Sequence, residues 1–545
     1  MHDTAAFDLP LLAVLLSAAV LLVLAYQTSI PYPILLVIGG AGIGFVPGLP
    51  AVELPPEAVL VIFLPPLLYS AAFFSSLRDL RDNKRPIGLL AVGLVVMTTL
   101  GIGVVAHAVV DDLSWAAAFT LGAIVAPTDP VAATAIASRS GAPRRIVTIL
   151  EGESLVNDAT ALVAYKVALA ALLTGTFSLL DATGSFVLQA VAGVAIGIAV
   201  SVAVAEVRRV IDDAPTEITI SLLTPFFAYL PAEALGVSAV LAAVTSGIWL
   251  GWRAPRLITS ATRIQLYSVW EVLTFVLNAA LFLLVGLQLP GIIERIADDY
   301  APADLALWAA LVAGSVIAIR FLWVFPATYI PRWLSRSLRE RDPVPPIGHV
   351  VIIAWVGMRG AVSLAAALAL PAEVPGRDLI VFLVYGVILV SLLLEGATLA
   401  PLIRLFGLHD DGRLDRVEVK ARIKTAKAAI ARIDELVGED WVREEEWVRP
   451  DTADRMRGLY EFRIRRFRAR FDDGDDGAID DRSVVYQHLQ RTVLEAQREE
   501  LIRLRDARFI NDEVLRRIEH DLDLEDARLE IPVGSVIPGS VAAAG

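Results

Sequence analysis

The sequence contains no cysteine, and only six of its 545 residues are histidine. Disulfide bonds and thiolate metal sites are therefore excluded, and the histidines show no metal-ligand spacing, which argues against a zinc site. The formal net charge of −13 argues against nucleic acid as a partner. No cofactor is predicted from this residue pattern.

What the chain has in abundance is apolar residues. The hydrophobic fraction is 56% and the mean hydropathy is +0.63, which is typical of a polytopic membrane protein and too apolar for a soluble protein of this size. The first apolar segment is long and lacks a basic leading region. It runs into Gln27–Tyr32 without a small-residue cleavage site, so it is predicted to be a transmembrane helix rather than a signal peptide.

Apolar stretches long enough to cross a bilayer recur through the first three quarters of the chain. The second is short and glycine-rich, and the eighth and ninth are separated only by Pro231–Gly236. The sequence predicts about thirteen spans, at roughly 7–26, 33–47, 56–75, 86–110, 115–138, 149–174, 184–206, 217–234, 236–252, 269–290, 304–330, 347–371 and 378–405.

The distribution of basic residues supports this count. Basic residues occur in alternate loops, and the intervening loops are acidic or uncharged, which holds only if residues 217–252 cross the membrane twice. The pattern predicts an external N-terminus and a cytoplasmic C-terminus. The basic loop residues are Arg78, Arg81, Lys84, Arg85, Arg139, Arg144, Arg145, Arg208, Arg209, Arg253, Arg256, Arg263, Arg332, Arg336, Arg339 and Arg341.

The composition changes after about residue 408, which divides the chain into a transmembrane domain, 1–407, and a cytosolic helical tail, 408–545. Val417–Leu436 and Val484–Ala507 have amphipathic helical patterns. The acidic stretch Asp472–Asp480 lacks the ligand register of an EF-hand and is interpreted as a solvated linker. The tail is predicted to be regulatory or dimer-stabilising, with a disordered end at Gly539–Gly545.

One transmembrane segment contains Asp129 between two prolines. Pro127 and Pro130 remove backbone donors and disfavour helical geometry before them, so the helix is expected to break and to free the carbonyl of Thr128 for a cation. An ionised aspartate in a membrane span costs at least ~2.5–3.5 kcal/mol. Asp129 is therefore interpreted as part of a binding site. The alternative is a proline kink in which Asp129 hydrogen-bonds to a neighbouring helix.

The following span supplies a second set of oxygen ligands. Ser154 and Asp158 are four residues apart and share one helix face, while Glu153 and Asn157 share an adjacent stripe. Together with Asp129 and the freed carbonyl they make an all-oxygen shell that suits a hard monovalent cation such as sodium. The same carboxylates can bind protons, so cation and proton are expected to compete for one place.

Other charged residues within the spans are assigned structural roles. Glu153 needs a basic partner, and Arg320 is favoured over Arg359. Lys166 is interpreted as a lysine that extends to the membrane interface. Two further acids are interpreted as packing partners near the interfaces: Glu271 and Glu395.

The twelfth span contains Gly357 and Gly360 within the small-residue stretch Ala354–Leu370. These glycines permit either close helix packing or a second backbone break that would cross the first. The residues alone leave both interpretations open.

Several motifs, taken in order, resemble the sodium/proton exchangers of the first monovalent cation:proton antiporter family over about residues 10–405. The motifs are Phe63–Tyr69, Thr128–Pro130, Glu151–Asp158, Trp270 through Asn278–Phe282 with Gly286, and Gly357–Ser363.

The resemblance implies a homodimer whose protomers contain inverted six-helix repeats, a core and a dimerisation domain, two crossing unwound helices, and alternating access. It implies an ion site formed by Thr128, Asp129, Ser154 and Asp158. Asn157 lies where electrogenic relatives carry a second aspartate, which implies electroneutral exchange. Glu153 and Arg320 match the buried ion pair of the family, whereas Glu395 departs from its usual glutamine.

The predicted function is therefore antiport and not enzymatic catalysis. The leading hypothesis is one-for-one exchange of Na⁺ (or Li⁺) for H⁺ across the plasma membrane, with K⁺/H⁺ exchange as the nearest alternative. An intramembrane aspartyl hydrolase also needs two membrane aspartates, but its Tyr-Asp and Gly-x-Gly-Asp motifs are absent. A channel-like sensor with an active acidic tail is a third hypothesis.

Overall fold

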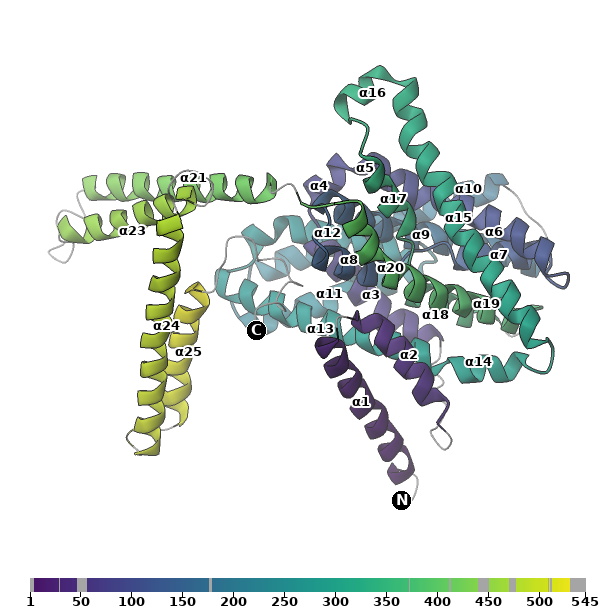
Figure 1. Ribbon diagram of the computed structural model, residues 1–545, viewed down its shortest axis with the longest axis horizontal. Coiled ribbons are helices and arrows are strands. Elements are labelled where there is room, and N and C mark those ends of the chain that lie inside the picture. The colour runs from purple at the N-terminus through teal and green to yellow at the C-terminus, as the bar shows by residue number, and fades with distance from the viewer. Residues whose placement is uncertain are drawn as a thin grey trace. The chain divides into compact units, whose positions relative to one another are not determined.

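The computed structural model describes residues 4–28, 30–46, 56–175, 179–371, 373–410, 413–439, 450–469, 477–507, 509 and 512–529. Every regular element in these ranges is a helix (Figure 1). The chain divides into two compact units, residues 1–409 and 410–545.

The first unit contains most of the helices. In its first half these are α1 (Thr4–Gln27), α2 (Tyr32–Gly44), α3 (Pro56–Phe74), α4 (Leu77–Asp82), α5 (Lys84–Gly88), α6 (Val95–Val109), α7 (Trp115–Ile124), α8 (Pro130–Arg139), α9 (Arg144–Thr174) and α10 (Leu179–Arg208). In its second half they are α11 (Ala214–Ala234), α12 (Ala239–Leu257), α13 (Ser260–Leu287), α14 (Leu289–Ile296), α15 (Pro302–Leu334), α16 (Arg336–Arg341), α17 (Ile347–Trp355), α18 (Ala361–Leu368), α19 (Arg377–Val390) and α20 (Gly396–Leu405).

Many of these helices have the character of membrane spans. Among the described residues, six stretches are long and apolar enough to cross a bilayer, and several shorter helices are also apolar. The chain is a multi-pass, all-helical membrane protein, and the count of thirteen spans stays a prediction. Two spans contain π-helical segments that the apolar pattern did not predict, η1 (Leu89–Leu94) and η2 (Ser391–Glu395).

The predicted boundary between the eighth and ninth spans is a turn between α11 and α12. Gly236 lies there with a φ of +69°, a left-handed conformation that glycine adopts without steric cost. The Ser238 side chain then accepts the backbone N–H of Leu241 and begins α12. Residues 217–252 therefore form two helices, as the charge pattern requires.

Close helix contact explains the glycines of the short second span. A Cβ at Gly40 of α2 would clash with the Leu283 carbonyl of α13, and a Cβ at Gly286 would clash with the Val37 carbonyl. Glycine at both positions lets α2 and α13 pack backbone against backbone.

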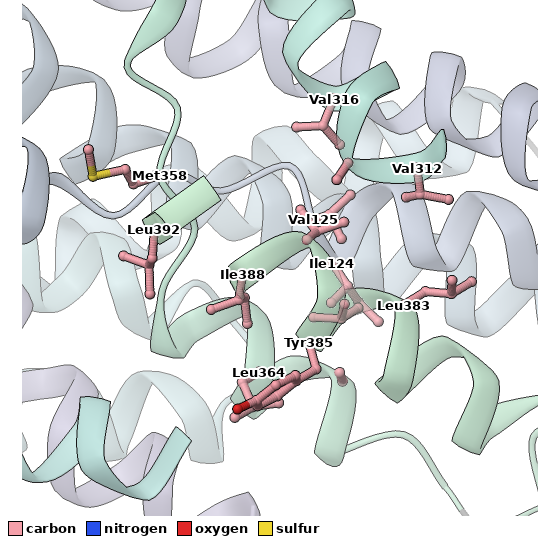
Figure 2. Close-up of a cluster of buried hydrophobic side chains, with 14 of the residues drawn as sticks. Ile124, Val125, Val312, Val316, Met358, Leu364, Leu383, Tyr385, Ile388 and Leu392 are labelled. Carbon is pink, nitrogen blue, oxygen red and sulfur yellow. The ribbon is translucent and has the colours of Figure 1, made fainter. Parts of the chain in front are cut away.

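The main hydrophobic core of the first unit surrounds two interruptions in its helices. Figure 2 shows Ile124 and Val125, at the end of α7, among buried side chains that include Met358 and Ile388. Since these residues come from distant parts of the sequence, the core holds the interrupted segments together.

The described residues of the second unit form α21 (Arg413–Gly438), α23 (Pro450–Ala469), α24 (Gly477–Asp506) and α25 (Asp512–Leu529). Both predicted amphipathic helices lie within this set. The predicted acidic linker extends too far, because Gly477–Asp480 already belongs to α24, while Asp472–Asp476 and Gly539–Gly545 lie outside the described residues. The leucines that join α24 to α25 are Leu494, Leu501, Leu515 and Leu522.

Candidate ion-binding site

The fifth predicted span is broken at its prolines. Helix α7 ends at Ile124 and α8 begins at Pro130, which leaves residues 125–129 without helical structure. Asp129 is the N-cap of α8, where its Oδ1 accepts the backbone N–H of Val131 at 2.8 Å. The two prolines thus break the helix, and the Asp129 carboxylate lies at the break.

The twelfth predicted span is also broken, so the second of the two interpretations of its glycines is correct. Residues 356–360 separate α17 from α18. The backbone N–H of Asp129 donates to the Met358 carbonyl at 2.7 Å, and a Cβ at Gly360 would clash with the Asp129 carboxylate. The two unwound stretches therefore cross in contact at Asp129.

Helix α9 brings three polar side chains to Thr128. The Ser154 hydroxyl donates to the Thr128 carbonyl at 2.9 Å, and the Asn157 amide Nδ2 donates to the Thr128 hydroxyl at 2.7 Å. That hydroxyl donates in turn to Glu153 Oε1 at 3.3 Å. All four residues are buried, so this network is the polar lining of the break.

Glu153 forms the ion pair with Arg320 that was favoured from the sequence. Nη1 and Nη2 of Arg320 donate to the two oxygens of Glu153, at 2.5 and 2.8 Å. Arg320 Nε also donates to the Ile353 carbonyl of α17 at 3.0 Å. Both residues are 1% exposed, so this desolvated, bidentate ion pair links α9 to α15.

Asp158 lies on α9 one turn beyond Ser154. Its carboxylate is buried and lies within electrostatic range of Asp129. Two carboxylates that share a low-dielectric site repel each other unless a proton or a cation lies between them. In the described part of the chain neither aspartate forms an ion pair with a basic side chain.

Arg359, the alternative partner for Glu153, instead bonds to the two unwound stretches. Its Nε donates to the Val125 carbonyl of the first break at 3.0 Å, and its Nη1 donates to the Gly357 carbonyl of the second. Its backbone N–H donates to the Ser391 hydroxyl at 3.0 Å. Arg359 therefore joins the two unwound stretches and places positive charge at the carbonyl ends of α7 and α17.

The position of Glu395 contradicts the prediction that it is a packing partner near a membrane interface. It is 1% exposed at the end of η2, and its Oε2 accepts the backbone N–H of Gly357 at 2.7 Å. Its carboxylate also lies within electrostatic range of Arg359. The signal that could have revealed it was a carboxylate inside a strongly apolar span. Glu271, in contrast, is exposed on α13.

Among the described residues, no group of three or more His, Cys, Asp or Glu side chains is arranged to hold a metal ion. The Ser154 hydroxyl meets the Thr128 carbonyl beside the Asp129 carboxylate, and the Asp158 carboxylate lies within electrostatic range of Asp129. Hard cations prefer such all-oxygen sets.

The family model of the sodium/hydrogen exchanger transmembrane domain matches residues 12–405. The chain belongs to the sodium/hydrogen exchanger family. An uncharacterised Na⁺/H⁺ exchanger of Mycobacterium tuberculosis is 35% identical over 97% of this chain and 98% of its own. The Na⁺/H⁺ antiporter NhaP of Pseudomonas aeruginosa is 36% identical over 64% of this chain and 81% of its own.

A solved structure shares the fold. The sodium proton antiporter MjNhaP1 of Methanocaldococcus jannaschii has a TM-score of 0.58 to this chain, with 21% identity, and the match covers 75% of this chain and 100% of MjNhaP1. At this identity the likeness establishes the architecture alone.

The Glu153–Arg320 pair yields a first prediction. Arg320→Ala leaves the Glu153 carboxylate buried and unpaired, which should lower the free energy of unfolding by about 3–5 kcal/mol. Glu153→Gln keeps an amide that can hydrogen-bond to its neighbours and should cost less. Thermal unfolding in detergent measures both variants. Equal and small losses would contradict a structural role for the pair.

Glu395 yields a second prediction. Glu395→Ala leaves the Gly357 N–H without its acceptor and removes the acid near Arg359, whereas Glu395→Gln keeps an acceptor for that N–H. The alanine variant should therefore unfold at a clearly lower temperature than the glutamine variant. If the two variants have the same midpoint, the hydrogen bond to Gly357 does not stabilise the crossing.

Proposed function

We propose that this protein is a secondary antiporter that exchanges Na⁺, or Li⁺, for H⁺ by alternating access. The observation that carries the proposal is the meeting of Asp129, at the crossing of the two unwound stretches, with the Ser154–Asp158 face of α9. Membership of the sodium/hydrogen exchanger family supports the same activity.

The cation ligands in this proposal are the Thr128 carbonyl, the Ser154 hydroxyl and the carboxylates of Asp129 and Asp158. The 2.9 Å hydrogen bond between Ser154 and Thr128 already brings two of these oxygens together. A cation bound there offsets the repulsion of the two carboxylates, and a proton offsets it equally when the cation leaves. Competition for one pair of acids is enough to couple the two fluxes.

Electroneutral, one-for-one exchange is proposed on the basis of Asn157. It donates to the Thr128 hydroxyl, so its amide is part of the site's lining and carries no charge. An acid in place of Asn157 would add a negative charge to the site and alter the net charge moved in each transport cycle.

Potassium is the competing cation. Relatives from Bacillus subtilis and Bacillus pumilus, 35% and 34% identical, are named sodium, potassium, lithium and rubidium/H⁺ antiporters. The first of these matches 64% of this chain and 54% of its own length. K⁺/H⁺ exchange by the same site is therefore the second candidate function.

The membrane orientation and assembly are also proposals. Basic residues in alternate loops support an external N-terminus and a cytoplasmic C-terminal unit in the plasma membrane. We further propose a homodimer with separate core and dimerisation subdomains within residues 1–407, and a regulatory tail from 408 onward.

A cation panel in proteoliposomes tests the function. Purified protein is reconstituted with a pH-sensitive dye inside the vesicles, and Na⁺, Li⁺, K⁺ or choline is added outside at several pH values. Proton movement that depends on Na⁺ or Li⁺ supports the proposal, and movement with K⁺ alone supports the second candidate. No cation-dependent proton flux with any ion would refute antiport.

The two aspartates yield a third prediction. Asp158→Asn and Asp129→Asn should each reduce Na⁺-dependent proton flux to the level of empty liposomes, because each removes a titratable cation ligand. The thermal midpoint should stay within a few degrees of wild type. Glu271→Gln is the matched control, since this acid lies in a predicted span but outside the site, and it should keep full transport. Retained exchange in Asp158→Asn removes that residue from the site.

Asn157 yields a fourth prediction. Asn157→Asp introduces a further acid beside Thr128, so transport should become sensitive to an imposed membrane potential. Wild-type exchange, measured in the same vesicles with a potassium–valinomycin potential, should be insensitive. A variant that transports with no dependence on potential would show that charge balance is set elsewhere.

A further inference from the structure

A cavity of about 60 Å³ lies apart from the ion site, between α5, η1, α9, α15 and α17. Its walls are largely apolar, and arginine is the charged residue type in its lining. The lining residues include Arg85, Arg145, Arg332, His349 and Ile353. In Figure 1, α5, α16 and α17 lie toward the same end of the first unit.

The three arginines converge on a single acid, Asp342. Arg332 Nη2 lies 2.5 Å and Arg85 Nη1 3.6 Å from Asp342 Oδ2, and Arg145 Nη2 lies 2.8 Å from Oδ1. One carboxylate balances one guanidinium, so two positive charges remain uncompensated. The cavity lining itself contains no acidic side chain.

The donors of this cluster are not all used. Arg85 Nη2 is buried without a hydrogen-bond partner. A buried, unpartnered guanidinium nitrogen is costly and marks a place where an acceptor belongs. Helices α9 and α17 also begin beside the cavity, at Arg144 and Ile347, and their positive ends favour an anion.

The surface beside the cluster is apolar and exposed. Trp333 and Leu334 follow Arg332 and are 79% and 72% exposed, and Ile347, two residues before His349, is 62% exposed. Basic residues beside exposed tryptophan and aliphatic side chains are typical of the membrane interface, where headgroups lie above acyl chains. A free inorganic anion would gain no favourable contact from these exposed apolar side chains, whereas lipid acyl chains would.

We propose that this cavity binds the phosphate of an anionic phospholipid headgroup, held by Arg85, Arg145 and Arg332, with the acyl chains along the apolar border. Guanidinium groups donate well to phosphate oxygens, and Arg85 Nη2 has no other partner. The nitrogens of Arg332 already donate to Asp342 and to the Thr328 carbonyl, so Arg332 contributes chiefly its positive charge. The site is on the basic-loop side of the chain, which faces the cytoplasmic leaflet in the proposed orientation.

The location connects the lipid site to the core helices. Ile353 contributes to the cavity wall, and its carbonyl accepts Arg320 Nε of the Glu153 pair. Helix α15 carries both Arg320 and Arg332. A bound headgroup would therefore fix one end of the helices that hold the buried ion pair.

Lipid binding is tested on the whole 545-residue chain, purified without lipid in an uncharged detergent. Dioctanoyl phosphatidylglycerol is titrated while the thermal midpoint is followed, with dioctanoyl phosphatidylcholine and inorganic phosphate as parallel arms. Phosphatidylglycerol should raise the midpoint by several degrees, and the other two should not. A full shift with inorganic phosphate would overturn the lipid source, and an equal shift with phosphatidylcholine would overturn the phosphate-binding role of the arginines.

Variants locate the site. Arg85→Gln combined with Arg145→Gln should raise the half-saturating phosphatidylglycerol concentration at least tenfold. Arg339→Gln, which removes an exposed arginine of α16 outside the cavity lining, should leave it unchanged. If the double variant proves unstable, Asp342→Asn provides an opposite test, because removal of the competing carboxylate should tighten lipid binding. Unchanged binding in the double variant, or weaker binding in Asp342→Asn, refutes the proposal.

Discussion

The structure depends on one constraint, which is that backbone leaving a helix inside a bilayer must find its hydrogen-bond partners within the protein. The two unwound stretches meet this constraint largely through each other. Asp129 donates its N–H to Met358, Arg359 donates to the Val125 carbonyl, and Glu395 accepts the N–H of Gly357. The crossing is therefore a connected unit, and the position of the Asp129 carboxylate follows from it.

Around this crossing, some charged side chains have partners of opposite charge within the protein and others do not. Glu153 is matched by Arg320 in a bidentate pair, and Arg359 lies within electrostatic range of Glu395. Within the described residues, Asp129 and Asp158 are left without a basic partner, although burying a carboxylate alone is costly. The proposed function assigns the compensation of these two acids to a proton or a cation from solution.

Sequence reasoning succeeded where the signal was local. Two prolines around Asp129 predict a break without knowledge of the fold, and helical spacing alone places Ser154 with Asp158. It failed where the answer depended on neighbours. An apolar pattern does not reveal the π-helical segment that ends at Glu395, and small residues around Gly360 are compatible with a packed helix as well as with a break.

The two oxygen atoms of Thr128, its hydroxyl and its carbonyl, have different hydrogen-bond partners. The Thr128 hydroxyl accepts from Asn157 and donates to Glu153, so it is committed to the lining. The carbonyl of the same residue accepts only the Ser154 hydroxyl among these contacts and keeps a second lone pair. The backbone oxygen is therefore the better cation ligand. The hydroxyl instead links the uncharged amide at position 157 to the Glu153–Arg320 pair. A charge placed at that position would therefore act on the buried ion pair as well as on a cation at the proposed site.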